Sequence, residues 1–161
     1  MNLRKAKLSL LFVLIVSLAL IVSAFQPKYA ILIVYANPEP DSYGNCINQI
    51  NIYQWNGTAY KLLTTETASN FELRVEDSKA IKIEVTVQLN STLASSEQEA
   101  IDYTECTITI GTIVTEASMI NTNCILQGDF YILTYEYEWN QAGYPQAGET
   151  YNVGIQYKAY Y

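Results

Sequence analysis

The chain contains no histidine, and this absence removes the commonest general base and the commonest transition-metal ligand together. Cysteine is scarce, with three residues whose spacing matches no zinc pattern. A closed zinc site with four protein ligands therefore cannot be built from this chain alone. We predict no catalytic residues, no metal site and no cofactor.

Basic residues are few and unevenly placed. Arg4, Lys5 and Lys7 are three of the nine Lys and Arg residues, so residues 26–161 hold six basic against sixteen acidic side chains, a net charge of −10. Proteins need clustered Lys and Arg to bind phosphate backbones. A surface this negative repels nucleic acid and anionic lipid headgroups, and neither is an expected partner.

The first 25 residues have the three-part pattern of an export signal. Met1–Lys7 is basic, Leu8–Phe25 is an uninterrupted apolar run of eighteen residues, and small residues permit cleavage after Ala24. A helix of that length spans about 27 Å, close to the ~30 Å hydrocarbon core, so a cleaved signal peptide and a retained signal-anchor helix both remain open. Either way, we expect residues 26–161 to be extracellular or at the cell surface, and membrane-anchored if the leader is retained.

Two further features agree with export. The tripeptides that begin at Asn56 and Asn90 match the N-glycosylation acceptor pattern, and both fall where turns are expected. The three cysteines, Cys46, Cys106 and Cys124, are candidates for one disulfide and leave one thiol over. The sequence does not determine which two of them pair.

Apolar and polar residues alternate from residue 47 to the end of the chain, which is typical of half-buried strands. Asn56-Gly57 predicts a hairpin with a two-residue type I′ turn, and Ser91–Asp102 predicts one or two helical turns between sheets. The expected strands are Tyr29–Tyr35, Asn48–Trp55, Thr58–Leu63, Asn70–Glu76, Ala80–Leu89, Thr104–Val114, Phe130–Trp139 and Tyr151–Tyr161. This pattern predicts an all-β fold: an antiparallel immunoglobulin-like β-sandwich of about seven or eight strands at 46–161, preceded by an N-terminal hydrophobic leader helix.

Residues 26–45 comprise an apolar strand and an acidic loop ahead of that sandwich. Tyr29–Tyr35 does not alternate, so it must be buried on both faces or lie in an environment other than water. It is the first strand of the domain itself, a continuation of the membrane anchor, or a strand donated to another subunit. In the last case the donor residues are Ile31, Leu32, Ile33 and Val34.

The chain has a definite layout of a hydrophobic leader, an apolar strand and a sandwich body that carries two acceptor sites. The leader is Leu8–Phe25, the strand is Ala30–Tyr35, and the acceptor sites are Asn56 and Asn90. In this layout the chain resembles the secreted thread-like and pilin-like surface-filament subunits of archaea. The resemblance implies a non-enzymatic structural protein that donates its N-terminal strand to the next copy and so builds a filament. Its expected partners are further copies of the chain or other surface proteins.

Acidic residues suggest two other functions. Glu136 and Glu138 lie on one face of a strand at about 7 Å, near the carboxylate separation of inverting glycosidases, although a solvated strand face explains them more simply. Glu39, Asp41 and Asn45 could bind calcium, but their spacing matches no known calcium loop and suits a plain turn.

Aromatic residues support the alternative function, a membrane-anchored carbohydrate- or protein-binding β-sandwich module. Aromatic side chains at strand spacing usually pack in the core, yet an exposed group of them would stack against sugars. Glycans are therefore a second class of expected partner. The candidates are Tyr53, Trp55, Tyr60, Tyr131, Tyr135, Tyr137 and Trp139.

Overall fold

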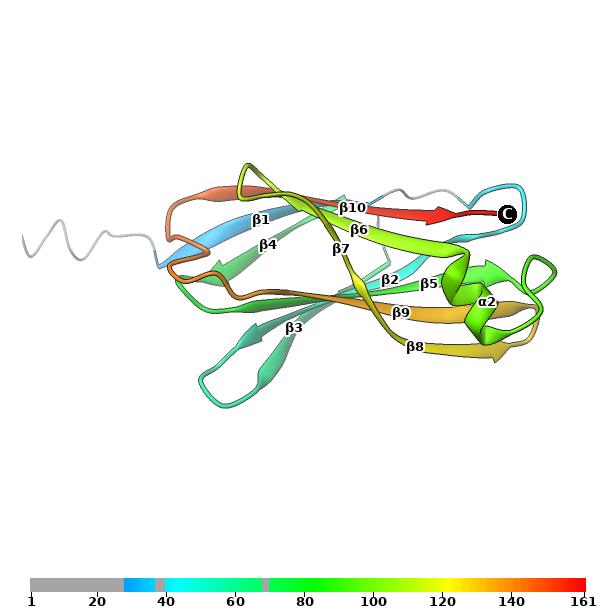
Figure 1. Ribbon diagram of the computed structural model, residues 1–161. Coiled ribbons are helices and arrows are strands. Elements are labelled where there is room, and N and C mark those ends of the chain that lie inside the picture. Colours follow the sequence, from blue (N-terminus) through cyan, green and yellow to red (C-terminus); the bar gives the residue numbers. More distant parts are fainter. Residues whose placement is uncertain (1–27, 37–39, 68–69) are drawn as a thin grey trace, which may run out of the picture.

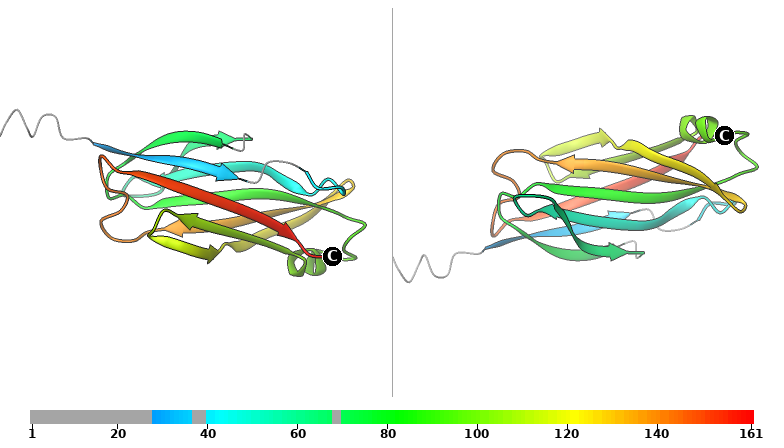
Figure 2. Two further views of the ribbon diagram at one scale, coloured as in Figure 1. Left: turned by 90° about the horizontal axis from the view of Figure 1, so that it is seen from above. Right: turned by 90° about the horizontal axis from the view of Figure 1, so that it is seen from below.

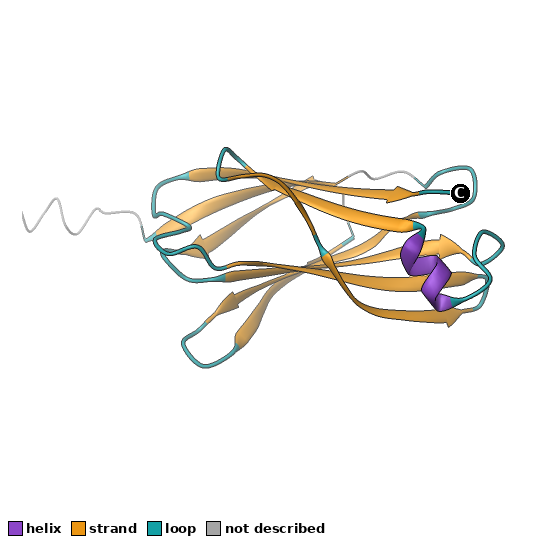
Figure 3. Ribbon diagram, viewed as in Figure 1, coloured by secondary structure: helices purple, strands orange, loops and turns teal. Residues whose placement is uncertain are grey.

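The computed structural model describes residues 28–36, 40–67 and 70–161, which form two stacked β-sheets (Figures 1 and 3). Sheet A has the order β4-β1-β10-β6-β7, and sheet B has the order β3-β2-β5-β9-β8. The all-β sandwich is confirmed, whereas the leader helix expected in residues 1–25 lies outside the described residues. The elements are β1 (Tyr29–Ala36), β2 (Cys46–Trp55), β3 (Tyr60–Glu66), β4 (Asn70–Glu76), β5 (Ile81–Asn90), α2 (Glu97–Asp102), β6 (Thr104–Ile110), β7 (Val114–Ser118), β8 (Ile120–Gln127), β9 (Phe130–Trp139) and β10 (Thr150–Ala159).

The described residues form ten strands, so the expected number of seven or eight is too low. The segment Thr104–Val114, expected as one strand, turns at Gly111, whose φ of +49° permits the reversal from β6 to β7. The chain then crosses at Met119 from sheet A to β8 in sheet B. The sequence of β8 lacks a clear period of two, and this strand was therefore missed.

The core between the sheets follows the alternation of the sequence. In β5 every second side chain, from Ile81 to Leu89, is fully buried, while the intervening polar side chains lie on the outer face of sheet B. In β9, Tyr131, Leu133 and Tyr135 are buried in the same way. The inner faces of sheets A and B therefore share one apolar core.

Hydrogen bonds tie the two sheets together at several points. The Tyr157 hydroxyl on β10 donates to the Gln88 carbonyl on β5 over 3.0 Å. Gln54 Nε2 on β2 donates to the Glu76 carbonyl at the end of β4, and the Glu76 N–H donates back to Gln54 Oε1. Gln54 is buried, so this reciprocal pair satisfies a polar side chain that would otherwise destabilise the core.

The predicted hairpin and helix are both present. The hairpin joins β2 to β3, but its turn covers residues 56–59 instead of the two residues of a type I′ turn. Asn56 Oδ1 accepts hydrogen bonds from the N–H groups of Thr58 and Ala59, which stabilises this wider turn. Helix α2 begins after Ser96, whose hydroxyl accepts a hydrogen bond from the Glu99 N–H.

Candidate functional site

Strand β1 lies inside sheet A, between β4 and β10, and not ahead of the sandwich body (Figure 2). It pairs antiparallel with β4 and parallel with β10. Every other strand pair in the described part of the chain is antiparallel, so the expectation of a wholly antiparallel sandwich is wrong at this position. A parallel pair requires a long connection, and here the first strand lies beside the last one.

The inner face of β1 fills an apolar groove. Ala30, Leu32 and Val34 are fully buried. The groove consists of the residues that flank them in register on the two neighbouring strands. These are Phe71, Leu73 and Val75 on β4 and Tyr151 and Val153 on β10.

The outer face of β1 is only partly covered. Ile31 and Ile33 are half-buried, while Tyr29 and Tyr35 are 50% and 47% exposed. Of the two alternatives for this strand, burial on both faces does not hold for the outer face, and an environment other than water is not tested. Of the four donor-strand candidates, Leu32 and Val34 point into the core, and Ile31 and Ile33 lie on the outer face of sheet A.

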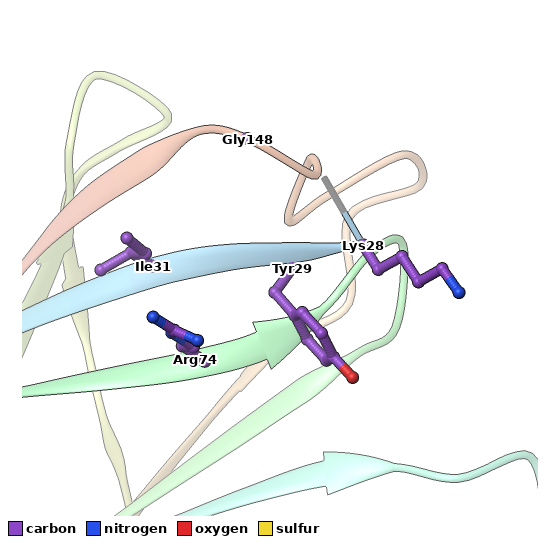
Figure 4. A pocket seen from close by; sticks show the side chains of 5 residues that line it. All are labelled: Lys28, Tyr29, Ile31, Arg74 and Gly148. Atoms are coloured by element: carbon purple, nitrogen blue, oxygen red, sulfur yellow. The ribbon is translucent and has the colours of Figure 1, made fainter. Parts of the chain in front are cut away.

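A pocket of about 250 Å³ lies where the chain enters β1 (Figure 4). Lys28, Tyr29 and Ile31 line it from β1 and the residue before it, Arg74 from β4, and Gly148 from the loop before β10. The Gly148 N–H donates to the Tyr29 carbonyl over 2.9 Å, and the Ile31 N–H donates to the Glu149 carbonyl over 2.9 Å. The start of β1 is thus held by the loop that precedes its parallel neighbour.

The loop that follows β1 is fixed from Asp41 onward. Asp41 Oδ1 accepts hydrogen bonds from the N–H groups of Tyr43 and Asn45, and Oδ2 accepts one from Asn45 Nδ2. Burial alone would raise the pKa of Asp41, but these hydrogen bonds hold it below its usual value. The carboxylate stabilises a turn, as in the simpler of the two interpretations, and Glu39 of the suggested calcium loop lies outside the described residues.

The two acceptor asparagines occupy different surroundings. Asn56 is exposed at the tip of the β2–β3 hairpin, whereas Asn90 is half-buried at the end of β5. In both, Oδ1 accepts hydrogen bonds from the backbone N–H and the hydroxyl of the threonine two positions later. Asn90 Nδ2 also donates to the Tyr43 carbonyl over 3.0 Å. The reactive nitrogen of Asn90 is therefore engaged by the loop that follows β1.

The disulfide expected from the cysteine count is not formed. Cys46, Cys106 and Cys124 are free thiols on β2, β6 and β8. Cys106 is buried in the core, and this burial raises the pKa of its thiol to about 12. A buried thiol of this kind behaves as a small apolar side chain.

Comparisons with known proteins identify no relative. The chain matches no protein-family model, no curated protein and no solved structure. Within residues 28–36, 40–67 and 70–161, no helix has the length and apolar character needed to cross a membrane. The same part of the chain contains no group of three or more acidic or cysteine side chains placed to hold a metal ion.

The aromatic candidates divide into two groups. Tyr131, Tyr135 and Trp139 are buried between the sheets, and Tyr137 is half-buried, so these four side chains form no exposed platform. By contrast, the remaining three candidates lie on the outer face of sheet B, where Trp55 is exposed. These three are Tyr53, Trp55 and Tyr60.

The carboxylates of β9 lie on the same outer face. Glu136 Oε1 is 3.4 Å from Lys82 Nζ, and Glu138 accepts a hydrogen bond from the Tyr60 hydroxyl. Glu136 thus has its polar partner on the neighbouring strand β5, whereas the partner of Glu138 lies on β3, the edge strand of sheet B. This arrangement fits the solvated strand face that was the simpler interpretation of the pair.

Proposed function

We propose that this protein is an exported, non-enzymatic structural subunit of the cell surface that assembles by donating its N-terminal strand. One observation carries the proposal: β1 occupies an interior position of sheet A, yet it is the first described strand and pairs parallel with the last one. The basic and apolar leader in residues 1–25 supports export. The repeated crossing of the chain between the two sheets supports an immunoglobulin-like connectivity.

The groove between β4 and β10 is the acceptor in this proposal. Each copy of the chain has the same groove and the same strand, so β1 of one copy fits the groove of the next with identical contacts. Backbone hydrogen bonds to β4 and β10 supply affinity, while Ala30, Leu32 and Val34 supply the side-chain fit. Donation from each copy to the next does not close on itself, and it therefore extends a filament.

Strand donation leaves only residues 37–40 between β1 and Asp41 to reach from one copy to the next. The hydrogen bonds of Asp41 with Tyr43 and Asn45 fix the loop downstream. Four extended residues span at most about 14 Å. That short reach requires the donor and acceptor bodies to lie close together, end to end.

A disulfide-trapping experiment tests strand donation directly. Ile33 on β1 lies opposite Glu72 on β4, and residues opposed in this way have Cα atoms about 4.5–5.5 Å apart, a separation that a disulfide can bridge. One chain carries Ile33→Cys and a second carries Glu72→Cys, both with Cys46 and Cys124 replaced by serine. When the two are co-expressed and exported, we expect a disulfide-linked heterodimer on a non-reducing gel.

The matched control uses two strands that stay within one body. Thr86 on β5 lies opposite Thr134 on β9. Chains that carry Thr86→Cys and Thr134→Cys separately should give no heterodimer. Strand donation is refuted if the Ile33/Glu72 mixture stays monomeric while a single chain with both substitutions closes an internal bridge. Mass spectrometry of the exported chain tests the leader in the same material, with Phe25 the expected first residue.

A further inference from the structure

The outer face of the β2–β3 hairpin carries apolar side chains that have no part in strand donation. Tyr53 and Trp55 on β2 lie opposite Leu62 and Tyr60 on β3, and the rings of Trp55 and Tyr60 meet edge-on with centroids 5.3 Å apart. Trp55 is 37% exposed and Leu62 is 46% exposed. Figure 1 shows the hairpin projecting away from the stacked sheets.

Hydrogen-bonding side chains on β5 and β9 lie beside the aromatic rings of Tyr53, Trp55 and Tyr60. The Tyr60 hydroxyl donates to Glu138 Oε1, and the Tyr53 hydroxyl donates to Glu84 Oε1 over 3.3 Å. Lys82 Nζ lies over the Tyr53 ring, 4.7 Å from its centroid. An ionised carboxylate has about four acceptor sites, so both glutamates retain capacity for hydroxyl donors.

The simplest alternative role of these rings is to stabilise the hairpin. A cross-strand aromatic pair such as Trp55–Tyr60 stabilises the hairpin that carries it. That role requires contact between the two rings, but it does not require an exposed Trp beside hydrogen-bonding carboxylates. The aromatic side chains Tyr135 and Trp139 on β9, in contrast, are covered by the opposite sheet.

We propose that Tyr53, Trp55 and Tyr60 form a binding platform for a neutral pyranose glycan. The ring faces pack against the C–H face of the sugar, while Glu84, Glu138 and Lys82 bond its hydroxyl groups. The net charge of −10 on residues 26–161 repels sulfated and uronic sugars, so the ligand is uncharged. This site does not depend on strand donation.

The two tryptophans allow a direct test by NMR. The exported chain has an exposed Trp55 and a buried Trp139, which give two indole N–H signals. The probes are neutral gluco-, manno-, galacto- and chito-oligosaccharides, with an oligogalacturonate as the charged comparison. At millimolar concentration, we expect at least one neutral probe to shift the Trp55 signal and leave the Trp139 signal unchanged, and the charged probe to shift neither.

Variants on the same face provide the controls. Trp55→Ala should weaken binding of the active probe about tenfold, the loss expected for one stacked ring, whereas Leu62→Ala should change it less than twofold. Thr58→Ala removes the neighbouring acceptor site; binding that appears only in this variant supports the platform and identifies the glycan on Asn56 as its natural occupant. No shift of Trp55 with any neutral probe in either chain, or a shift only with a lysine-rich peptide, would overturn the proposal.

Discussion

Strands β1 and β5 are both interior strands whose inner faces are fully buried, but they differ on their outer faces. β5 carries Lys82, Glu84 and further polar side chains there, while β1 carries Ile31 and Ile33 between two exposed tyrosines. A shift of one residue in β5 would bury charged side chains, so its register is strongly specified. The same shift in β1 exchanges one set of apolar side chains for another.

The difference shows how a strand can be well buried without a strongly specified register. The register of β1 depends on the fit of Ala30, Leu32 and Val34 into the groove, because charge does not oppose a slip. Among the described strands, β1 is joined in sequence to β2 alone. β5, by contrast, is joined to described elements at both ends, β4 before it and α2 after it.

The largest difference between β1 and β5 is expected when a charge is buried in each strand. Leu32→Asp and Val85→Asp each place a carboxylate at a fully buried position and should cost more than about 5 kcal/mol of unfolding free energy. We expect neither full-length variant to fold alone. A synthetic peptide of residues 28–36, flanked by lysines for solubility, should restore near-UV circular dichroism to Leu32→Asp, because an intact β1 then fills the groove.

The same peptide should have no effect on Val85→Asp, because β5 cannot be supplied from outside. Rescue of both variants would mean that the peptide acts through general hydrophobic contact. Failure to rescue Leu32→Asp would mean that β1 cannot be replaced in trans.

A smaller effect is expected at Gly154, the only glycine within a described strand. It lies on β10 between Tyr35 of β1 and Thr109 of β6. An added Cβ would be 2.6 Å from Thr109 Oγ1, so Gly154→Ala should lower the unfolding free energy by about 1–2 kcal/mol, measured with urea. The loss of unfolding free energy measures how closely sheet A is packed beside β1, for comparison with the packing of sheet B around β5.

The second substitution Thr109→Ala provides the control. It removes Oγ1 and leaves the Thr109 Cβ at 3.9 Å, an ordinary contact. The double variant should therefore recover most of the lost stability. An unchanged stability of the single variant would instead show that β10 shifts freely beside β1.

The sequence predicted those parts of the fold in which local alternation is strong. The bounds of β4 and β9 were predicted to the residue, because each alternates over its whole length. The edge strand β8 was missed, since Ile120 is 72% exposed and the burial of its side chains follows no period of two. The parallel pairing of β1 with β10 has no local signal, because it joins residues more than a hundred positions apart.

The candidate platform shows a second limit of sequence patterns. The aromatic residues of β9 and β2 have the same strand spacing, but those of β9 face the core and Trp55 of β2 does not. The reason is Gln54, which takes the inward position and is satisfied there by the backbone of Glu76. Because the polar Gln54 faces the core and is satisfied by a distant partner, the aromatic side chains of β2 face outward, opposite to what their spacing suggests.

The smallest expected effect concerns the loop that ties β1 to β2. Because the folded-state pKa of Asp41 lies below its usual value, its stabilising contribution is present above about pH 4 and is lost as the pH falls through the folded pKa. Asp41→Asn should lower the unfolding free energy by about 0.5 kcal/mol at pH 7, an amount limited by solvent screening at this exposed position, and by almost nothing near pH 2. Urea unfolding of both chains at the two pH values measures this difference. An equal loss at both pH values would show that the loop depends on the shape of the side chain and not on its charge.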